Sequence, residues 1–211
     1  MTNKKRSLLD GLVSGNTVLS GFMVISPIIV CGNTVMNALA LIYAFSSITF
    51  ISVMSGSFIP KKLPYGLKIM IYAIIASIVY IPVRAAAEEF FPDIIPRIGI
   101  YFMLIAVNSL ITVQTEAKFY RMTKGKMTLS LILHILGFDA VMLIIAAVRE
   151  ILAYGTFCER LVDADIIISG FGEPFGGFIL LGLFCGIYRG ICNVLSHDVD
   201  VSGGDADVSN I

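Results

Sequence analysis

The sequence of 211 residues is 57% hydrophobic and 14% charged, with a mean hydropathy of +0.89. A soluble domain carries roughly a quarter charged residues, so this composition indicates an integral membrane protein. The formal net charge of zero offers no basic surface for nucleic acid, and the scattered acidic residues do not form a disordered acidic segment. At about 20 residues per span plus loops, the length allows about six transmembrane helices.

The N-terminal part of the sequence sets the architecture. Residues 1–10 are predicted to form a cytoplasmic N-terminus with a basic cluster at Lys4, Lys5 and Arg6. This cluster is not expected to begin a signal peptide, because the uncharged stretch that follows runs from Gly11 to Pro60 and lacks a short apolar core with a small-residue cleavage site. As one helix this stretch would measure roughly 75 Å against a hydrocarbon core of about 30 Å, so it must reverse direction.

The reversal is predicted between Ser26 and Asn33, where Pro27 removes a backbone donor and Gly32-Asn33 forms a turn pair. Charged loops that contain prolines divide the remaining sequence. We therefore predict an all-α membrane domain over residues 11–195, followed by a disordered cytoplasmic tail over residues 196–211. Its six spans are Val18–Cys31, Thr34–Ser55, Leu67–Val83, Ile98–Thr115, Met127–Val148 and Phe175–Leu195.

The basic residues predict the orientation. With six spans, eleven of the 15 Lys and Arg residues lie on the same side as the N-terminus. Because cytoplasmic loops carry an excess of Lys and Arg, both termini are predicted to be cytoplasmic. The four cysteines, Cys31, Cys158, Cys185 and Cys192, show no zinc-type spacing. Three of them lie in or beside apolar stretches, and a structural role as free thiols is favoured.

Polar side chains gather in three of the apolar spans. Two explanations stay open for them: small and polar residues can pack helices together, or short and broken first and fourth helices can meet near the membrane midplane, as in inverted-repeat proteins. The residues in the first two spans are Asn16, Thr17, Ser20, Ser26, Asn33, Thr34 and Asn37, and those in the fourth are Asn108, Ser109, Thr112, Gln114 and Thr115.

The fifth span contains two ionisable residues, His134 and Asp139, and ends with Arg149-Glu150. A carboxylate at this depth is costly, so Asp139 must be protonated, paired or exposed to an ion pathway. Structural and ion-pathway roles both stay open for Asp139, while a structural role is favoured for His134. The two are five residues apart, which disfavours a direct pair. Arg149-Glu150 is interpreted as an anchor of a helix end or a subunit contact.

Five stretches in order resemble one family. The run from Asn16-Thr17-Val18 through Ser26-Pro27-Ile28-Ile29 to Asn37-Ala38-Leu39 is similar to the first span of the paired membrane subunits of the Rnf and Nqr ion-translocating oxidoreductases. The resemblance covers about residues 11 to 192. The four later stretches are Ile59-Pro60 with Ile69–Ala76, Val107-Asn108-Ser109 with Glu116-Ala117, Val148–Leu152 and Gly177–Gly182.

This resemblance implies six helices in two inverted three-helix halves, with two paralogous subunits in opposite orientations in a prokaryotic cytoplasmic (inner) membrane. The predicted cytoplasmic N-terminus matches the E subunit of Rnf and the D subunit of Nqr. It implies as partners an oppositely oriented paralogue, other Rnf/Nqr-like subunits and the lipid bilayer, but no nucleic acid. It also implies that Ser26 and Ser109 face each other near the pseudo-twofold axis at the midplane.

The sequence departs from the family at those two positions. The family has a Cys before the proline of the first span and another after the asparagine of the fourth, and two such cysteines from each partner hold an iron–sulfur centre. Here the residues are Ser26 and Ser109, and a hydroxyl is a poor iron ligand. We therefore expect no cofactor in this chain alone. Asp139 is a second departure, since the family usually has a small uncharged residue there.

Three functions follow as hypotheses. The first is a membrane subunit of an Rnf/Nqr-like electron-transport complex that moves Na+ or H+. The second is a redox-inactive paralogue that transports a small solute or ion, or assembles a complex. The third, which needs no homology, is the substrate-binding subunit of a vitamin or metal importer, and the ordered motifs disfavour it. No catalytic residue is predicted, because no nucleotide loop, flavin-attachment motif or activated nucleophile is present in the sequence, so the chain is at most a non-catalytic subunit of a translocase.

Overall fold

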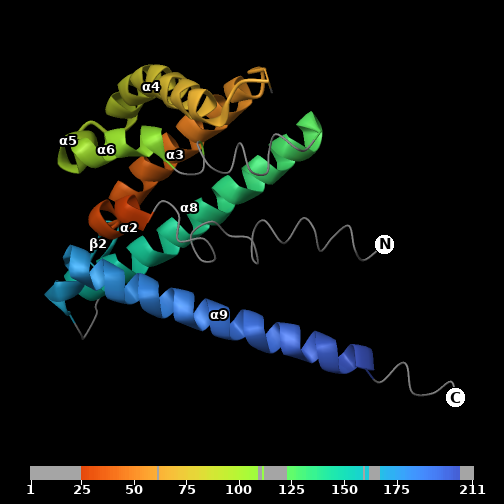
Figure 1. Cartoon of the computed structure of the whole chain (residues 1–211). Coiled ribbons are helices and arrows are strands. Elements are labelled where there is room, and N and C mark those ends of the chain that lie inside the picture. The colour runs from red at the N-terminus through yellow and green to blue at the C-terminus, as the bar shows by residue number, and fades with distance from the viewer. Residues whose placement is uncertain are drawn as a thin grey trace, which may run out of the picture.

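The computed structural model describes residues 25–60, 62–108, 111, 123–158, 160–161 and 167–204, and this part is mostly helical (Figure 1). Three of its helices are long and apolar enough to cross a membrane: α3 (Val35–Gly56), α4 (Tyr65–Phe90) and α8 (Lys124–Tyr154). They correspond to the second, third and fifth predicted spans. The strands β1 (Thr156–Phe157) and β2 (Arg160–Leu161) form a two-stranded antiparallel pair beyond α8, which the all-α prediction did not include.

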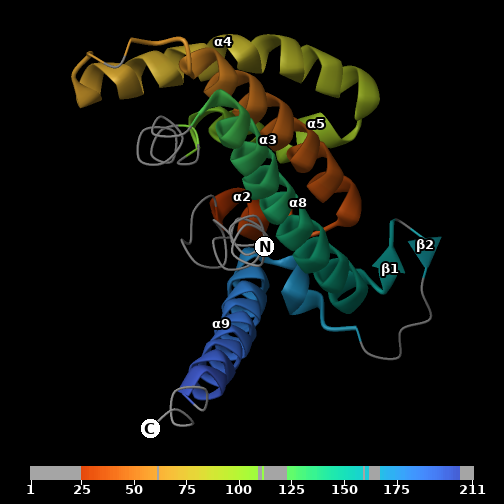
Figure 2. The same ribbon diagram turned by 90° about the vertical axis from the view of Figure 1, so that its right-hand side faces the viewer.

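Helix α3 lies between α4 and α8 and packs against both (Figures 1 and 2). Its buried face carries small residues, including Ala38, Ala40 and Ala44, which let neighbouring helix backbones approach closely. Phe45 of α3 stacks on Phe138 of α8, with 3.8 Å between the ring centroids. The core of the described domain therefore lies along both sides of α3.

Helices α4 and α8 are longer than the predicted spans, because charged residues that were assigned to loops are helical. In α4, Arg84 and Glu88 form an ion pair of 2.8 Å one helical turn apart, a spacing that favours helix. Helix α8 continues through Arg149-Glu150 to Tyr154. It is followed by Gly155, whose φ of 62° is a left-handed conformation that glycine adopts without steric cost.

The first predicted span ends in a short helix, α2 (Ile25–Cys31), and the chain reverses at Gly32–Thr34. The reversal lies at the end of the predicted interval, extends one residue beyond it to Thr34, and follows Pro27, which lies inside α2. Proline is tolerated there because the N–H groups of the first helical turn have no intrahelical partner.

The fourth apolar stretch is divided rather than continuous. It contains α5 (Ile94–Ile98), α6 (Ile100–Leu104) and the 3₁₀ helix η1 (Ile105–Val107). Gly99, with a φ of 57°, separates α5 from α6, and Asn108 is extended after η1. The prediction of a broken helix in this stretch agrees with these interruptions as far as Asn108; beyond it, only Ile111 is described before residue 123.

The last helix, α9 (Pro174–Gly204), follows the 3₁₀ helix η4 (Ser169–Gly172). It contacts α2 and α8 and then runs away from the group formed by α3, α4 and α8 (Figures 1 and 2). Its apolar part is Pro174–Gly190. Helix α9 passes the predicted domain end at residue 195, and the predicted boundaries at residues 10 and 195 stay predictions.

Candidate functional site

The side chain of Arg149 joins three elements at one end of α8. It is fully buried and donates hydrogen bonds to six backbone carbonyls. Three acceptors, the carbonyls of Ile28, Ile29 and Gly32 at 2.8 to 3.2 Å, belong to the C-terminal end of α2 and the turn after it. The other three, at 3.0 to 3.2 Å, are the carbonyls of Phe171, Gly172 and Glu173 before α9.

This arrangement has a clear physical cause. The last carbonyls of a helix lack intrahelical partners and carry partial negative charge. A guanidinium with five N–H groups can satisfy several carbonyls at once, which a lysine ammonium cannot. Gly177 of α9 permits the contact, because a Cβ atom there would lie 3.0 Å from both Arg149 Nη1 and the Ile29 carbonyl oxygen.

The next residue, Glu150, binds the opposite kind of helix end. Its Oε2 accepts a hydrogen bond of 2.6 Å from the backbone N–H of Val35, the first residue of α3, and its Oε1 accepts one of 3.1 Å from the Thr156 hydroxyl. A carboxylate is favourable at a helix N-terminus. The adjacent charges of Arg149 and Glu150 thus hold α2 and α3 on either side of the reversal, which confirms the interpretation of this pair as a helix-end anchor.

Polar side chains of the reversal itself complete the turn. The Thr34 hydroxyl caps α3 by accepting a hydrogen bond from the backbone N–H of Asn37, and Asn37 Nδ2 donates to Asn33 Oδ1 at 2.8 Å. Asn33 Nδ2 contacts the Tyr154 hydroxyl at 3.4 Å. Three of the polar residues that the sequence singled out, Asn33, Thr34 and Asn37, therefore stabilise the break between two helices.

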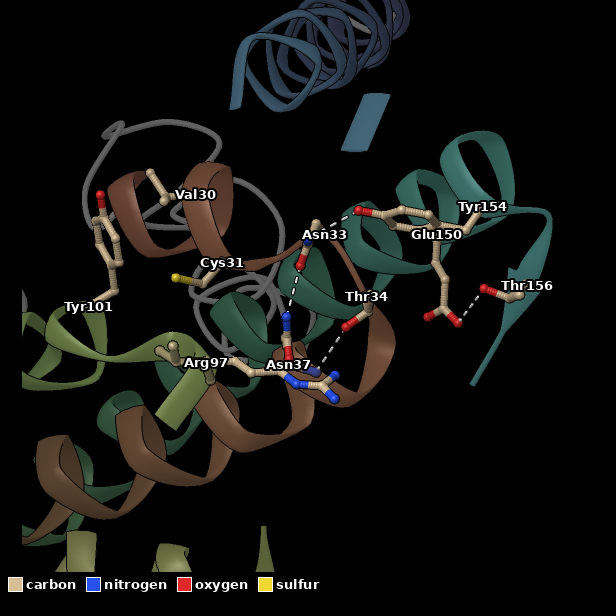
Figure 3. Close-up of a pocket in the computed structure, with 11 residues that line it drawn as sticks. Val30, Cys31, Asn33, Thr34, Asn37, Arg97, Tyr101, Glu150, Tyr154 and Thr156 are labelled. Carbon is tan, nitrogen blue, oxygen red and sulfur yellow. Dashed lines mark hydrogen bonds between the residues drawn. The ribbon is translucent and has the colours of Figure 1, made fainter. Parts of the chain in front are cut away.

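A cavity of about 450 Å³ with a mixed polar and apolar lining opens beside this reversal (Figure 3). Its walls come from the end of α2, the start of α3, the α5–α6 region and the end of α8 with β1. Figure 3 shows the Arg97 guanidinium directed towards Asn37 and the start of α3, while the Glu150 carboxylate lies on the other side beside Thr156. The volume and the polar part of the lining can hold water or a small polar solute.

Asn108 organises the second helix break. Its buried side chain donates through Nδ2 to the Thr49 hydroxyl at 3.1 Å and to the Ile105 carbonyl at 2.9 Å, and its Oδ1 accepts from the backbone N–H of Ile111 at 3.0 Å. The first contact ties the break to α3. The other two satisfy backbone groups on both sides of the interruption, which a continuous helix would satisfy internally.

Asp139 and His134 have separate partners. Oδ2 of Asp139 accepts a hydrogen bond of 2.9 Å from the Ser46 hydroxyl of α3, and Oδ1 is buried without a hydrogen-bond partner in the described part of the chain. Nδ1 of His134 lies 2.6 Å from the Ser130 carbonyl oxygen, one turn earlier in α8. These bonds agree with the expectation that the two side chains do not pair. The ion-pathway role of each stays a prediction.

Of the two serines at the family's cysteine positions, the structure describes Ser26 but not Ser109. Ser26 lies in the first turn of α2 with an exposed side chain, whereas Ser109 lies outside the described residues. Their predicted convergence stays a prediction. Cys31 is buried at the opposite end of α2, five residues or about 7.5 Å of helix from Ser26, so its thiol does not replace a ligand at that position.

Sequence reasoning identified Arg149, Glu150 and Asn108 from their charge or polarity but missed their contacts. It also missed Ser46 and Thr49, which bind Asp139 and Asn108. Hydroxyl side chains are common in membrane helices, so neither residue carries a distinctive signal alone. The available signal was their position, since both lie well inside the apolar stretch that became α3.

Residues 5–185 match the Rnf-Nqr family, described as "Rnf-Nqr subunit, membrane protein". The chain is 28% identical over 168 residues to the E subunit of the ion-translocating oxidoreductase complex of Shewanella amazonensis, an alignment that covers 75% of this chain and 68% of that protein. It is 24% identical over 201 residues to the E subunit of the same kind of complex in Yersinia pseudotuberculosis, with 87% and 85% covered. It is 27% identical over 179 residues to the D subunit of the Na(+)-translocating NADH-quinone reductase of Chlamydia pneumoniae, with 83% and 84% covered. The family match includes both helix breaks.

Proposed function

This chain belongs to the Rnf-Nqr family of membrane subunits, and from that membership we propose that it is a membrane subunit of an electron-transport complex that couples electron transfer to the translocation of Na+ or H+. The observation that carries the proposal is the family match over residues 5–185. Relatives named as subunits of ion-translocating oxidoreductases support it. The importer hypothesis loses its main support, since that hypothesis rested on length and hydropathy alone.

The proposed subunit has six spans in two inverted halves and both termini in the cytoplasm of a prokaryotic cell. Three apolar helices of sufficient length, a short helix α2 and a divided fourth stretch support the proposed arrangement. The excess of basic residues on the N-terminal side supports the orientation. In this orientation the cavity beside Arg97 and Glu150 opens towards the outer side of the membrane.

The proposed partner is a paralogous membrane subunit of opposite orientation, together with other subunits of the complex. The names of the relatives, which describe subunits of multi-subunit complexes, support this proposal. Exposed apolar side chains of α4 at Met70, Ile74, Ile78 and Ile81 form a surface that requires lipid or another membrane helix.

The donor set of this chain does not fit an iron–sulfur centre. Ser26 supplies an exposed hydroxyl on α2, and iron–sulfur centres are held by thiolates. We therefore propose that no iron ligand comes from Ser26 or Ser109. Replacing both residues with cysteine should raise the iron content of the purified complex, provided that the partner supplies its own two cysteines. Each single replacement is the matched control and should leave the iron content unchanged.

A second candidate function is favoured by the same two serines. A paralogue that has lost its redox centre would keep the fold and transport a small ion, or only assemble a complex. The two functions differ in their partners. A redox subunit is required by the first and is not required by the second.

Purification of the tagged chain from native membranes tests both. We expect mass spectrometry to identify a homologous membrane subunit and at least one flavin or iron–sulfur subunit, with visible absorption that changes on reduction. Recovery of a homologous subunit without any redox subunit would support the redox-inactive paralogue. Recovery with neither would overturn the main proposal.

A further inference from the structure

The carboxyl group of Asp139 lies at the depth of the hydrocarbon core. Asp139 is fifteen residues from Lys124 and from Tyr154, the two ends of α8, which is about 22 Å of helix in each direction. Its partner Ser46 lies near the middle of α3 (Val35–Gly56). Half of a bilayer core is about 15 Å thick. Both midpoints therefore place this contact well away from either membrane surface.

The carboxyl group has few polar contacts among the described residues. The Ser46 hydroxyl donates to Oδ2 at 2.9 Å, while Oδ1 is buried and has no hydrogen-bond partner among the residues that the structure describes. The residues next to this contact in each helix, Phe45 and Phe138, are fully buried and stack on each other. One hydroxyl beside an aromatic pair gives little solvation for a negative charge.

Among the residues that the structure describes, no charged side chain on α3 or on the neighbouring turns of α8 supplies the missing stabilisation. On α3 the one titratable side chain is Tyr43, whose ring packs against Phe90 and Phe91. On α8 the nearest titratable residue is His134, which bonds to the Ser130 carbonyl. The remaining titratable groups on the elements packed against α8 are Cys31 on α2, Glu173 before α9, and Cys185, Tyr188 and Arg189 on the part of α9 whose side chains are described, a helix that diverges from α8 (Figure 1).

The free-energy cost of burial differs between the ionised and the neutral form of this carboxyl group. Burying an ionised carboxylate without a cation or several donors costs several kcal/mol even after relaxation of the protein. A neutral carboxylic acid whose hydrogen lacks an acceptor costs only about 1–3 kcal/mol. The neutral form is therefore the less costly one at this position.

We propose that Asp139 is a proton-binding group at the middle of the membrane, with Oδ2 bonded to the Ser46 hydroxyl and the proton carried on Oδ1. Uptake forms an O–H bond between Oδ1 and a proton that water supplies, and release returns the proton to water and leaves the carboxylate. The transport role of this site rests on the proposed function. In a complex that moves ions, Asp139 is a group of this chain that takes up a transported proton.

The same geometry favours a proton over a metal ion. Cations such as Ca²⁺ and Mg²⁺ require about six or more oxygen ligands, and in the described part of the chain the contact at Asp139 consists of one carboxyl group and one hydroxyl. A proton requires one oxygen. Binding of Na+ at Asp139 is the alternative that the experiment below distinguishes.

The position of Ser46 also connects the acid to the second helix break. Ser46 precedes Thr49 by about one turn of α3, and the Thr49 hydroxyl accepts the hydrogen bond from Asn108. Asn108 immediately precedes Ser109 in the sequence. A movement of the break at Asn108 can therefore reach Ser46 through α3 and alter the hydrogen bond that holds Asp139.

Chemical labelling of the intact complex tests the proposal. Dicyclohexylcarbodiimide reacts with protonated carboxyl groups in apolar surroundings, where the acid O–H adds across an N=C bond of the reagent. We expect mass spectrometry to find the adduct on the peptide that contains Asp139. The signal should fall by at least about tenfold in Asp139→Asn, because the amide has no acidic proton. Glu88→Gln, which removes an exposed carboxyl group of α4, is the matched control and should leave the labelling at Asp139 unchanged.

Two further measurements can be made on the unmodified complex, so they do not depend on the folding of a variant. Infrared difference spectra of the unmodified complex should contain a carboxylic-acid C=O band, and this band should shift when the Ser46→Ala variant removes the hydrogen bond. Addition of Na+ should not protect Asp139 from the carbodiimide. Protection by Na+, absence of labelling, or absence of the acid band would each overturn the proposal. None of these readouts requires a redox subunit, so they are independent of the proposed electron-transport function.

Discussion

The two polar regions of helix α8 differ in how completely the protein satisfies their charges. At one end, Arg149 makes six hydrogen bonds and Glu150 bonds to the backbone of α3 and to Thr156. In the middle, Asp139 receives one hydrogen bond from the described residues, that of Ser46. The first region has many backbone partners and the second has one side-chain partner.

This difference separates a structural role from a functional one. A charge that is enclosed by compensating groups stabilises one arrangement of the chain, and removing it leaves buried groups without partners. A buried carboxyl group with few partners contributes little to the fold, and its presence in a membrane helix requires another explanation. Substitutions at the end of α8 should therefore lower mainly the stability of the fold. Substitutions at Asp139 should lower mainly ion transport.

The largest loss of stability is expected for Arg149→Met, which keeps side-chain length but removes every donor. Six carbonyls would lose this donor. Those of Ile28 and Glu173 also accept backbone N–H groups, so up to four would be left unpaired, at about 1–3 kcal/mol for each that stays buried, and the total loss should exceed about 3 kcal/mol. Unfolding can be followed by a thiol-reactive dye, since Cys31 and Cys185 are buried and free. The exposed Arg84→Gln variant is the control, and an unchanged transition for Arg149→Met would contradict the assigned role.

A smaller loss, about 1–2 kcal/mol, is expected for Asn108→Ala. The change removes the contact to Thr49 and the two bonds that satisfy backbone groups on either side of the break. Asn108→Asp is the matched control, because it keeps an acceptor for the N–H of Ile111 while it removes the donor. Thermal transitions of the two variants should differ, and equal transitions would show that the bond from the Ile111 N–H to residue 108 contributes nothing measurable.

The long apolar helices and the breaks between shorter ones could be predicted from sequence because both follow from residue types. Uncharged stretches predicted α3, α4 and α8, and Gly32-Asn33 predicted a turn where the chain does reverse. The ends of α4 and α8 were placed too early. In α4 the local ion pair Arg84–Glu88 favours helix beyond the predicted end, and in α8 the charged residues Arg149 and Glu150 bond to other elements while they remain helical. Composition alone does not contain that information.

The contacts of the candidate site could not be predicted, for a different reason. Arg149 lies 120 residues from Ile29, and Asp139 lies 93 residues from Ser46. Such pairs depend on which helices become neighbours, and no local pattern specifies this. The sequence indicated that Arg149 and Asp139 required partners, and the fold determines that one has many partners and the other has one.

A modest loss, about 1 kcal/mol, is expected for Glu150→Gln. The amide oxygen can still accept from the N–H of Val35, but the favourable interaction of a negative charge with the N-terminus of α3 disappears. The measurement is again the midpoint of dye labelling, compared with Glu88→Gln as an exposed carboxyl group. A loss as large as that of Arg149→Met would indicate that Glu150 stabilises the reversal by more than its bonds to Val35 and Thr156 account for.

The smallest change in stability is expected for Asp139→Asn, within about 1 kcal/mol of the unmodified chain. The asparagine oxygen can keep the hydrogen bond from Ser46, and the buried neutral amide replaces a group that we propose is already neutral. Ion transport by the intact complex should nevertheless fall strongly, because asparagine cannot take up and release a proton. Ser46→Ala should have an intermediate effect on transport with an equally small effect on unfolding, since it removes the partner but leaves the acid. If Asp139→Asn instead unfolded as readily as Arg149→Met while transport per folded complex was unchanged, the carboxyl group would be structural, and the contrast between the two regions of α8 would be lost.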